Sequence, residues 1–318
     1  MPKARDRAGL IRRVQYQVEY AFVRVLAGLV GRMPEPVAVK LGVLLGWTFW
    51  AFGRRRRRIA RRNIERAMPG EHTDAEVRRI VKEVFINIGL TAVETLWMRR
   101  HGNREVFDRH YEEEGLDRLQ ATLDEGAPPI TFTGHLGNWE LLGAYVATRI
   151  GTVNALARPV NNPKVRSYTT RLRQELGLQV ISTRDGVRPM LRALKRGETL
   201  AVLIDQHVNR AFVPATFFGR KAATTAVVAT LALRLDTPVF AVYSLRRGHQ
   251  FRHRAVVEGP IELERTGDPE ADVLANTQRF NDALEAAVRR HPEQWLWTHR
   301  RWKLDDRPPR DNEVTDGR

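Results

Sequence analysis

The chain has 318 residues, and 42% of them are hydrophobic, so it can bury a substantial core and is not disordered throughout. It contains no cysteine, which excludes disulfide bonds, a thiolate nucleophile and a cysteine-ligated zinc site. Its formal net charge of +16 at pH 7 favours polyanionic partners, which include anionic lipid, nucleic acid and acidic proteins.

Residues 1–58 predict a helical segment that associates with a membrane and ends in a run of arginines. The apolar stretches 21–31 and 41–53 are separated by the sequence MPEP, and each is shorter than the roughly 20 residues that span a bilayer. Trp47 and Trp50 suit the headgroup region, and the arginines that follow suit an anionic cytoplasmic leaflet. We therefore expect monotopic insertion or a helical hairpin without a cleavable signal sequence. Two ordinary core helices followed by a solvated basic face would give the same pattern.

The rest of the chain alternates between helical and strand-like patterns. Apolar residues recur at helical spacing over 74–100, and a further helix is expected over 111–126. The predicted strands are 128–134, 152–159, 178–183, 198–206, 237–247 and 250–263. The predicted helices between and after them are 138–151, 162–177, 186–197, 224–236 and 273–292.

This alternation predicts one α/β domain over 59–304, with a largely parallel central sheet flanked by helices. Residues 305–318 are polar and contain two prolines, so we expect a disordered tail.

The sequence ITFTGHLGNWELLG, residues 130–143, joins a predicted strand to a helix and places His135 where sites form in open α/β sheets. Residues five apart in a continuous helix lie about 140° out of phase, so His135 must lie in the turn if it cooperates with Glu140 in the first helical turn. There, Glu140 could hydrogen-bond one imidazole nitrogen and leave the other basic. The alternative is an ordinary loop histidine followed by an acid that favours the helix N-terminus.

Two common catalytic motifs are absent from the sequence. It has no Gly-x-Ser-x-Gly nucleophile elbow and no phosphate-binding Gly-x4-Gly-Lys-Ser/Thr loop. A base without a protein nucleophile suits direct attack by a substrate hydroxyl on an activated acyl carbonyl. His135 would take the hydroxyl proton.

Several motifs, in order, resemble those of the bacterial lipid A late acyltransferases, which belong to the glycerolipid acyltransferase superfamily with its His-x4-Asp/Glu hallmark. They are TGHLGNWELLG, ARPVNNPKV, LIDQHVNRAFVPATFFGRKAATT and QWLWTHRRWK, preceded by the apolar, arginine-rich amino-terminal region. The resemblance covers residues 22–303. One departure is the insertion of Ala215 and Thr216 between Pro214 and Phe217, which puts the likeness of the acceptor pocket in doubt.

The resemblance implies an α/β fold with a mixed sheet and membrane-contacting amino-terminal helices. It also implies transfer of a fatty acyl chain from acyl carrier protein, or from coenzyme A, to a hydroxyl of a membrane lipid, foremost a lipid A precursor. The expected location is the cytoplasmic face of the inner membrane. No metal or cofactor is required, and we expect a monomer. His135 would be the general base and Glu140 its orienting partner.

Three further residues are candidates for the substrate site. Arg158 ends a predicted strand, where it could bind acceptor phosphate or the thioester oxygen, although a surface ion pair is the ordinary fate of such a residue. Asp205 and Gln206 end another strand and could shape the site or hold Arg158; the alternative for Asp205 is a turn.

Asn138 could support the turn or contact substrate. Arg300 and Arg301, in the HRRW sequence, predict a cationic rim for the phosphate of a carrier protein or a lipid, unless this segment serves only to pack Trp302.

Competing interpretations remain. The same chemistry could act on a lysophospholipid, a mannosylated phosphoinositide or an ornithine lipid. The sequence RRRRRIARR could bind nucleic acid, but it follows LGWTFWAFG, which favours a lipid interface, so no nucleic-acid partner is expected. The protein could also be a scaffold in which the His-Glu pair is inert.

Overall fold

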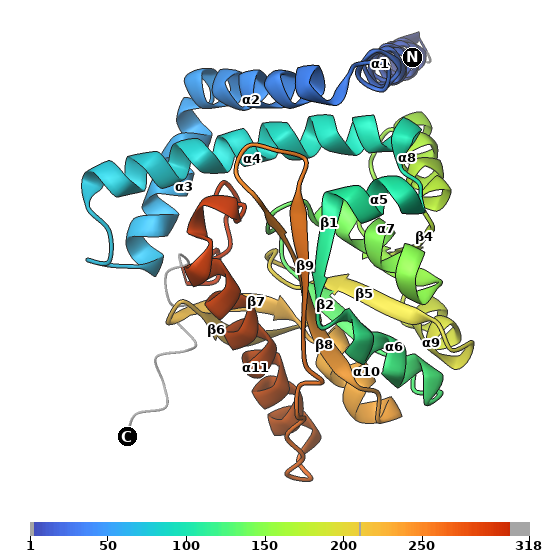
Figure 1. Cartoon of the computed structure of the whole chain (residues 1–318), viewed down its shortest axis with the longest axis vertical. Helices are drawn as coiled ribbons and strands as arrows, with labels where there is room; N and C mark the ends of the chain where they lie inside the picture. The colour runs from blue at the N-terminus through green and yellow to red at the C-terminus, as the bar shows by residue number, and fades with distance from the viewer. Residues whose placement is uncertain (1–2, 210, 306–318) are drawn as a thin grey trace.

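The computed structural model describes residues 3–209 and 211–305 (Figure 1). Within these ranges, seven strands form one sheet in the order β1-β9-β8-β2-β5-β3-β4. Neighbouring strands are parallel except β8 and β9, which are antiparallel, so the sheet is mixed but mostly parallel. The strands are β1 (Tyr111–Glu114), β2 (Ile130–Thr133), β3 (Val153–Ala157), β4 (Leu178–Ser182), β5 (Thr199–Leu203), β8 (Val239–Arg246) and β9 (His253–Glu258).

Helices cover both faces of this sheet, as the α/β pattern predicts. One face packs against α5 (Arg104–His110), α6 (Leu116–Asp124) and α7 (Trp139–Ile150). The other packs against α9 (Arg188–Lys195), α10 (Val227–Leu235) and α11 (Pro269–Arg290). Strand β8 serves both cores, because Phe240 and Val242 face the first layer while Ala241 and Tyr243 face the second. The remaining crossover helix, α8 (Pro163–Glu175), joins β3 to β4.

The amino-terminal helices are α1 (Lys3–Val30), α2 (Glu35–Phe52), α3 (Arg54–Ala67) and α4 (Asp74–His101). Helices α1 and α2 lie above α4 in Figure 1. Helix α2 approaches α4 closely through glycines, since a Cβ atom on Gly89 would lie 2.4 Å from the backbone nitrogen of Gly46. Through this close contact with α4, the apolar amino-terminal region packs against the rest of the described structure.

No helix in the described ranges has, taken singly, the length and apolar character needed to cross a bilayer. Helices α2 and α3 meet that requirement only when combined, and the chain bends by 90° between them. Membrane association of residues 1–58 therefore stays a prediction.

The sequence prediction differs from the structure in two segments. Residues 111–114 form β1 instead of a helix, because they pair in parallel with the edge of β9. Residues 212–225 form a separate two-stranded hairpin, β6 (Phe212–Phe217) and β7 (Arg220–Thr225), which was not predicted. Of the expected tail, Asp305 forms ion pairs with Arg66 and Arg220, and residues 306–318 lie outside the described residues.

Candidate active site

The turn between β2 and α7 carries His135 to the carboxyl edge of the sheet. Strand β2 pairs in parallel with β5, and Thr133 is directly opposite Leu203. Because parallel strands end at the same edge, the residues that follow β2 and β5 meet there. His135 and Asp205 are therefore neighbours, although 70 positions separate them in the chain.

Asp205 holds His135 by two hydrogen bonds. Its Oδ1 lies 2.7 Å from the His135 Nδ1, and its Oδ2 accepts the His135 backbone N–H at 2.6 Å. Oδ2 also accepts the indole N–H of Trp295 at 2.8 Å. A Cβ atom on Gly134 would lie 3.1 Å from this Oδ2 and 2.8 Å from the Leu284 Cδ1, so a larger residue at this position would displace both side chains. With the carboxylate accepting at Nδ1, the proton of the neutral imidazole is on Nδ1 and Nε2 is left basic.

The surroundings keep Asp205 ionised and strengthen His135 as a base. Burial alone would raise the pKa of Asp205, but the charge of His135 and the hydrogen bonds from His135 and Trp295 hold it well below its usual range. Burial also opposes the charged imidazolium, yet the charge and hydrogen bond of Asp205, with the charge of Glu140, raise the pKa of His135 above its ordinary value. An imidazolium that forms during a reaction is thus stabilised by a fixed neighbour.

Glu140 does not form the predicted hydrogen bond to His135. It pairs with Arg173 of α8, whose Nη2 lies 2.9 Å and 3.0 Å from the two carboxylate oxygens. The prediction was wrong because Glu140 extends from the first turn of α7 toward α8, while Asp205 occupies the Nδ1 side of the imidazole. Glu140 contributes charge to the site without contacting the base.

Gln206 lies on the other side of the imidazole. Its amide nitrogen is 2.9 Å from the His135 Nε2 and is suited to donate to that unprotonated nitrogen. Gln206 is exposed and lines the cavity beside the histidine. It therefore occupies the position from which a hydroxyl would deliver a proton to Nε2.

A cavity of about 450 Å³ opens beside His135. Its mouth is polar and includes Gln206, Arg158 and the Glu140–Arg173 pair. Its interior is apolar and is formed by Leu142, Val146, Val153, Ala155, Leu178 and Val242. A cavity with this lining can hold an apolar chain inside and a polar end beside the histidine.

Arg158 follows β3 and is exposed at the cavity mouth. Its side chain forms no hydrogen bond or ion pair with any residue in the described ranges, so its guanidinium is open to a ligand. Asp205 does not hold it, contrary to one of the two predictions for Asp205, because that carboxylate is already occupied by His135 and Trp295.

Two predicted substrate contacts are instead parts of the buried framework. Asn138 is 0% exposed, caps α7 by accepting the Leu141 N–H, and donates to Glu94. Arg301 is also 0% exposed and donates to the Ala223 carbonyl and the Thr224 hydroxyl. Asn138 thus supports the turn, which is one of the two roles predicted for it, and Arg301 has the structural role that was the alternative for its segment. The predicted substrate contact is wrong for both, because their side chains are buried.

The predicted cationic rim is therefore reduced to Arg300, which is exposed. Burial lowers the pKa of Arg301 to about 10, and its guanidinium ties the carboxy-terminal segment to the β6–β7 hairpin. The nearby His299 has its pKa lowered to about 4 by burial, so it is neutral near pH 7 and adds no charge.

Two residues of the site were missed from the sequence. Trp295 supports Asp205 and stands in the quoted sequence QWLWTHRRWK, but nothing in its spacing links it to the strand ends. Arg173 lies in the predicted helix 162–177, and only the packing of α8 near α7 brings it to Glu140. Both contacts depend on tertiary structure.

Comparisons with known proteins identify the family of this chain. The family model of the bacterial lipid A biosynthesis acyltransferases matches residues 7–304. The chain is 29% identical to the lipid A biosynthesis palmitoleoyltransferase of Escherichia coli K12 over 86% of this chain and 87% of that protein. It is 26% identical to the lauroyltransferase of the same organism over 86% and 88%. It is also 24% identical to the phosphatidylinositol mannoside acyltransferase of Mycolicibacterium smegmatis over 60% and 62%.

The residues matched by the family model include all seven strands of the mixed sheet and the turn with His135. They also include Trp295, which donates to Asp205. The protein is therefore an O-acyltransferase, and the chain belongs to the bacterial lipid A biosynthesis acyltransferase family.

Proposed function

We propose that this protein transfers a fatty acyl chain from an acyl carrier protein thioester, or from coenzyme A, to a hydroxyl of a lipid A precursor. The observation that carries the proposal is the His135–Asp205 pair at the mouth of an apolar cavity. The names of the relatives in Escherichia coli support the acceptor class.

In this mechanism, His135 Nε2 takes the proton of the acceptor hydroxyl as its oxygen attacks the thioester carbonyl carbon. Asp205 keeps the proton of the neutral imidazole on Nδ1 and stabilises the imidazolium. The tetrahedral intermediate then collapses, the carbon–sulfur bond breaks, and the leaving thiolate receives the proton from Nε2. No covalent acyl-enzyme is required, and the imidazole returns to its starting state.

The cavity provides a place for the donor chain. Its apolar interior between α7 and the sheet would hold the alkyl chain, so that the thioester lies at the polar mouth. Arg158 would bind the acceptor phosphate or steady the thioester oxygen, because its guanidinium is exposed there.

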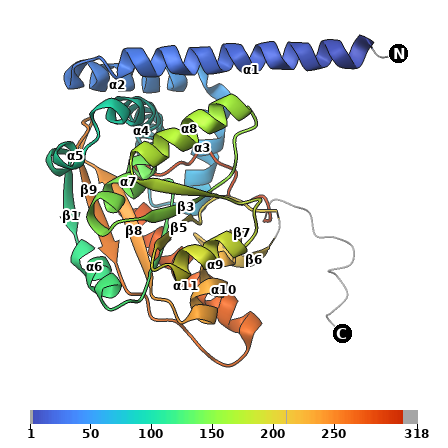
Figure 2. The same ribbon diagram turned by 90° about the vertical axis from the view of Figure 1, so that its right-hand side faces the viewer.

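An exposed apolar surface supports docking on the cytoplasmic face of the inner membrane. Figure 2 shows α1 as a long helix along one side of the molecule, with α2 beside one of its ends and α4 beneath that end. Phe22 is 67% exposed, Leu44 is 62% exposed and Phe52 is 85% exposed. Helices that carry such side chains beside a basic run lie in the plane of the interface.

The loop after β3 ties this layer to the active site. Asn162, four residues after Arg158, donates to the Tyr16 carbonyl at 3.0 Å and to Glu19 at 2.9 Å, both in α1. A lipid headgroup at the α1 surface would thus lie next to the loop that carries Arg158. This supports acceptor entry directly from the membrane.

The nucleic-acid alternative has less support. The arginines of α3 directly follow the apolar end of α2, and Arg57 lies over the ring of Trp50 at 4.7 Å. A single-strand interface would instead interleave aromatic and basic residues on a strand platform. Cosedimentation should show binding to anionic vesicles that excess DNA does not displace. Displacement by DNA would favour the alternative.

The test uses the full chain in mixed detergent–lipid micelles, with acyl carrier protein and coenzyme A thioesters as donors. The acceptors are a lipid A precursor, a lysophospholipid, a mannosylated phosphoinositide and an ornithine lipid, and the products are measured by mass spectrometry. We expect one acyl chain to be added to the lipid A precursor.

His135→Ala should lower that transfer at least about 100-fold, the usual contribution of a general base. His249→Ala is the matched control, since His249 is an exposed histidine that pairs with Glu83 away from the cavity. Transfer that His135→Ala leaves undiminished would overturn the mechanism, and transfer only to another acceptor would overturn the substrate.

A further inference from the structure

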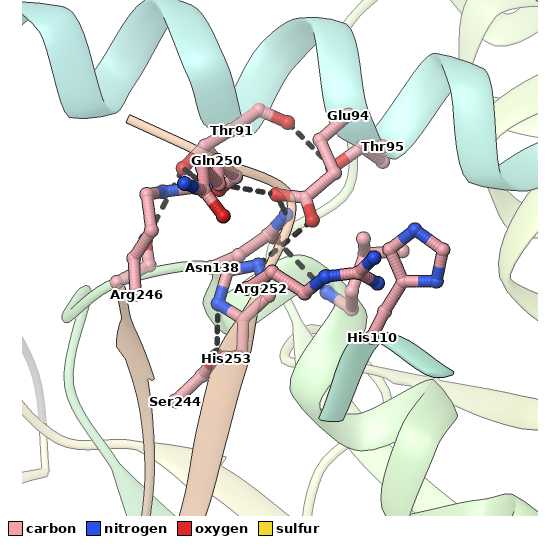
Figure 3. A network of polar contacts seen from close by, with 12 residues as sticks. Thr91, Glu94, Thr95, His110, Asn138, Ser244, Arg246, Gln250, Arg252 and His253 are labelled. Carbon is pink, nitrogen blue, oxygen red and sulfur yellow. Dashed lines mark hydrogen bonds and ion pairs between the residues drawn. The ribbon is translucent and has the colours of Figure 1, made fainter. Parts of the chain in front are cut away.

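Figure 3 shows a second cluster of charged and polar groups, which lies beneath α4. It joins Glu94 of α4 to Arg246 at the end of β8 and His253 at the start of β9. Their side chains are 1%, 3% and 0% exposed. We call Glu94, Arg246, His253 and Asn138 the Glu94 network.

The carboxylate of Glu94 is at its centre. Its Oε2 lies 2.7 Å from Arg246 Nη1 and accepts the amide of Asn138 at 2.8 Å. Its Oε1 lies 2.7 Å from His253 Nε2. Burial alone would raise the pKa of Glu94, but Arg246, His253 and Asn138 outweigh it and lower that pKa to about 2. A permanent negative charge is thus held inside the protein by directed partners.

One arm of the network reaches the catalytic turn through Asn138. The same side chain that donates to Glu94 accepts the Leu141 N–H and caps α7. Asn138 is three residues from His135 and 0% exposed. Its rotation is therefore set by Glu94, and it fixes where α7 begins relative to the histidine.

Another contact goes through Arg246 to the backbone of the turn. The Arg246 guanidinium donates to the side-chain Oδ1 of Asn87 at 2.9 Å and to the Thr91 hydroxyl at 3.2 Å. Asn87 and Thr91 each donate in turn to the Gly137 carbonyl at 3.2 Å. Gly137 has φ +58°, and a Cβ atom there would lie 1.7 Å from the Ser244 carbonyl, so the turn rests directly on β8.

The third contact reaches the segment that supports Asp205. The Arg246 backbone exchanges two hydrogen bonds with the Gln294 side chain, at 2.7 Å and 3.0 Å. The Gln294 carbonyl accepts the Gly137 N–H, and the next residue, Trp295, donates to Asp205. The segment that supports Asp205 is therefore hydrogen-bonded both to the turn, at Gly137, and to the backbone of Arg246, whose guanidinium pairs with Glu94.

We propose that Glu94 is a positioning residue for acyl transfer, which acts by fixing Asn138 and Arg246 and, through them, the geometry of His135 and Asp205. The proposal rests on the proposed role of His135 as general base. Glu94 is not among the described residues that line the cavity, so it acts through the turn and not on the substrate.

The first test is Glu94→Gln, which keeps the shape of the side chain but removes the negative charge that faces Arg246 and replaces one carboxylate oxygen with an amide NH2. We expect kcat to fall about 10- to 100-fold, as for a small misplacement of a catalytic group, with the KM for the thioester changed less than about 3-fold. The fall of kcat/KM on the acidic side of its pH profile, called the acid limb below, should move to lower pH. The reason is that a weaker contact with Asp205 lowers the pKa of His135. A purely structural role would lower stability and leave that limb in place.

A swap of the two side chains gives a sharper readout. Asn138→Asp alone would face Glu94 with a second carboxylate and should lose activity to a similar extent. The double variant Glu94→Gln/Asn138→Asp restores an amide donor opposite a carboxylate and keeps the α7 cap. It should regain at least about 5-fold over the weaker single variant, because the two residues are in direct contact.

Two further variants keep the test decisive. Asp272→Asn removes a buried carboxylate that accepts from Thr266, and it should lower the melting temperature without changing kcat or the acid limb. If Glu94→Gln does not fold, Thr91→Val, which removes one donor to the Gly137 carbonyl, should show the same acid-limb shift in smaller degree.

A folded Glu94→Gln, or its substitute Thr91→Val, with unchanged kcat and an unchanged acid limb would overturn the positioning role. If the wild type transfers acyl chains and His135→Ala does not, such a result leaves the proposed function intact. Failure of the wild type itself would instead count against the proposed function.

Discussion

Two histidine–carboxylate pairs in this protein have the same separation and opposite properties. His135 lies 2.7 Å from Asp205 and His253 lies 2.7 Å from Glu94. Yet the pKa of His135 is raised above its ordinary value, while that of His253 is lowered. A short contact with a carboxylate does not by itself make a base.

The difference arises from what else each pair contacts. Burial is the largest influence on His253 and favours its neutral form, and Arg246 adds repulsion while it shares the Glu94 carboxylate. The second nitrogen of His253 is also used, since Nδ1 lies 3.1 Å from the Ser244 hydroxyl. Among residues 3–209 and 211–305, no second cation pairs with the Asp205 carboxylate, and the hydrogen-bond partner of the His135 Nε2 is Gln206, at the cavity. The two pairs therefore differ in whether the carboxylate is shared with a second cation and in whether the second imidazole nitrogen reaches a cavity.

Asp205→Asn is expected to reduce acyl transfer more than any other variant in this comparison, because it removes the property that distinguishes the His135 pair from the His253 pair. The amide oxygen would keep the donors His135 N–H and Trp295 N–H, so the amide NH2 would face Nδ1 and donate to it. The neutral imidazole would then carry its proton on Nε2 and could not act as base. Acyl transfer should fall about 1,000-fold or more, as when the carboxylate of a catalytic triad is replaced by an amide. The rate of product formation by mass spectrometry checks this, and a loss below about 10-fold would contradict it.

A smaller effect on acyl transfer is expected from Glu140→Gln, which tests how a charge that does not contact His135 influences its pKa. Glu140 raises the pKa of His135 only through its charge, because its carboxylate is bound to Arg173. The variant should shift the acid limb of kcat/KM slightly to lower pH and reduce kcat by less than about 10-fold. The pH profile is the measurement. A loss as large as that of His135→Ala would show that Glu140 moves to His135 during the reaction.

The smallest effect is expected from His249→Ala, which removes a third histidine–carboxylate pair, His249–Glu83, on the surface. His249 lies 2.6 Å from Glu83, and both side chains are substantially exposed to water. Exposed ion pairs contribute only about 0–1 kcal/mol, so the free energy of unfolding should change by less than about 1 kcal/mol. Urea titration measures this. A larger loss, or a shift of the acid limb, would mean that this surface is coupled to the site.

Much of the fold follows from the sequence, because alternating apolar periods predict elements locally. The parallel strands and crossover helices from residue 128 onward agree with that pattern. Segment 111–114 could not be predicted, since YEEE forms a strand only by pairing with β9. The β6–β7 hairpin was missed in a similar way, because nothing local signals that it packs separately from the main sheet.

The site was predicted in its position but not in its pairing. The sequence predicted that His135 and Asp205 each follow a strand, but the strand order, which makes β2 and β5 neighbours, is not encoded locally. The prediction therefore assigned Glu140 to His135 by proximity in the chain. Arg301 was misplaced for a related reason, because charge in a sequence gives no sign that a guanidinium is buried among carbonyl and hydroxyl acceptors.

The pH dependence of kcat/KM for acyl transfer by the wild-type protein tests the central claim most directly. In the proposed mechanism, only the neutral imidazole of His135 can accept the hydroxyl proton, so activity should be lost as pH falls through the His135 pKa. Because Asp205 raises that pKa, we expect the acid limb to lie above the ordinary histidine value of about 6.5. Variants that weaken the hydrogen bond between Asp205 and His135 should move the acid limb to lower pH. A limb at or below that value, or a rate without dependence on pH between about 5 and 9, would contradict it.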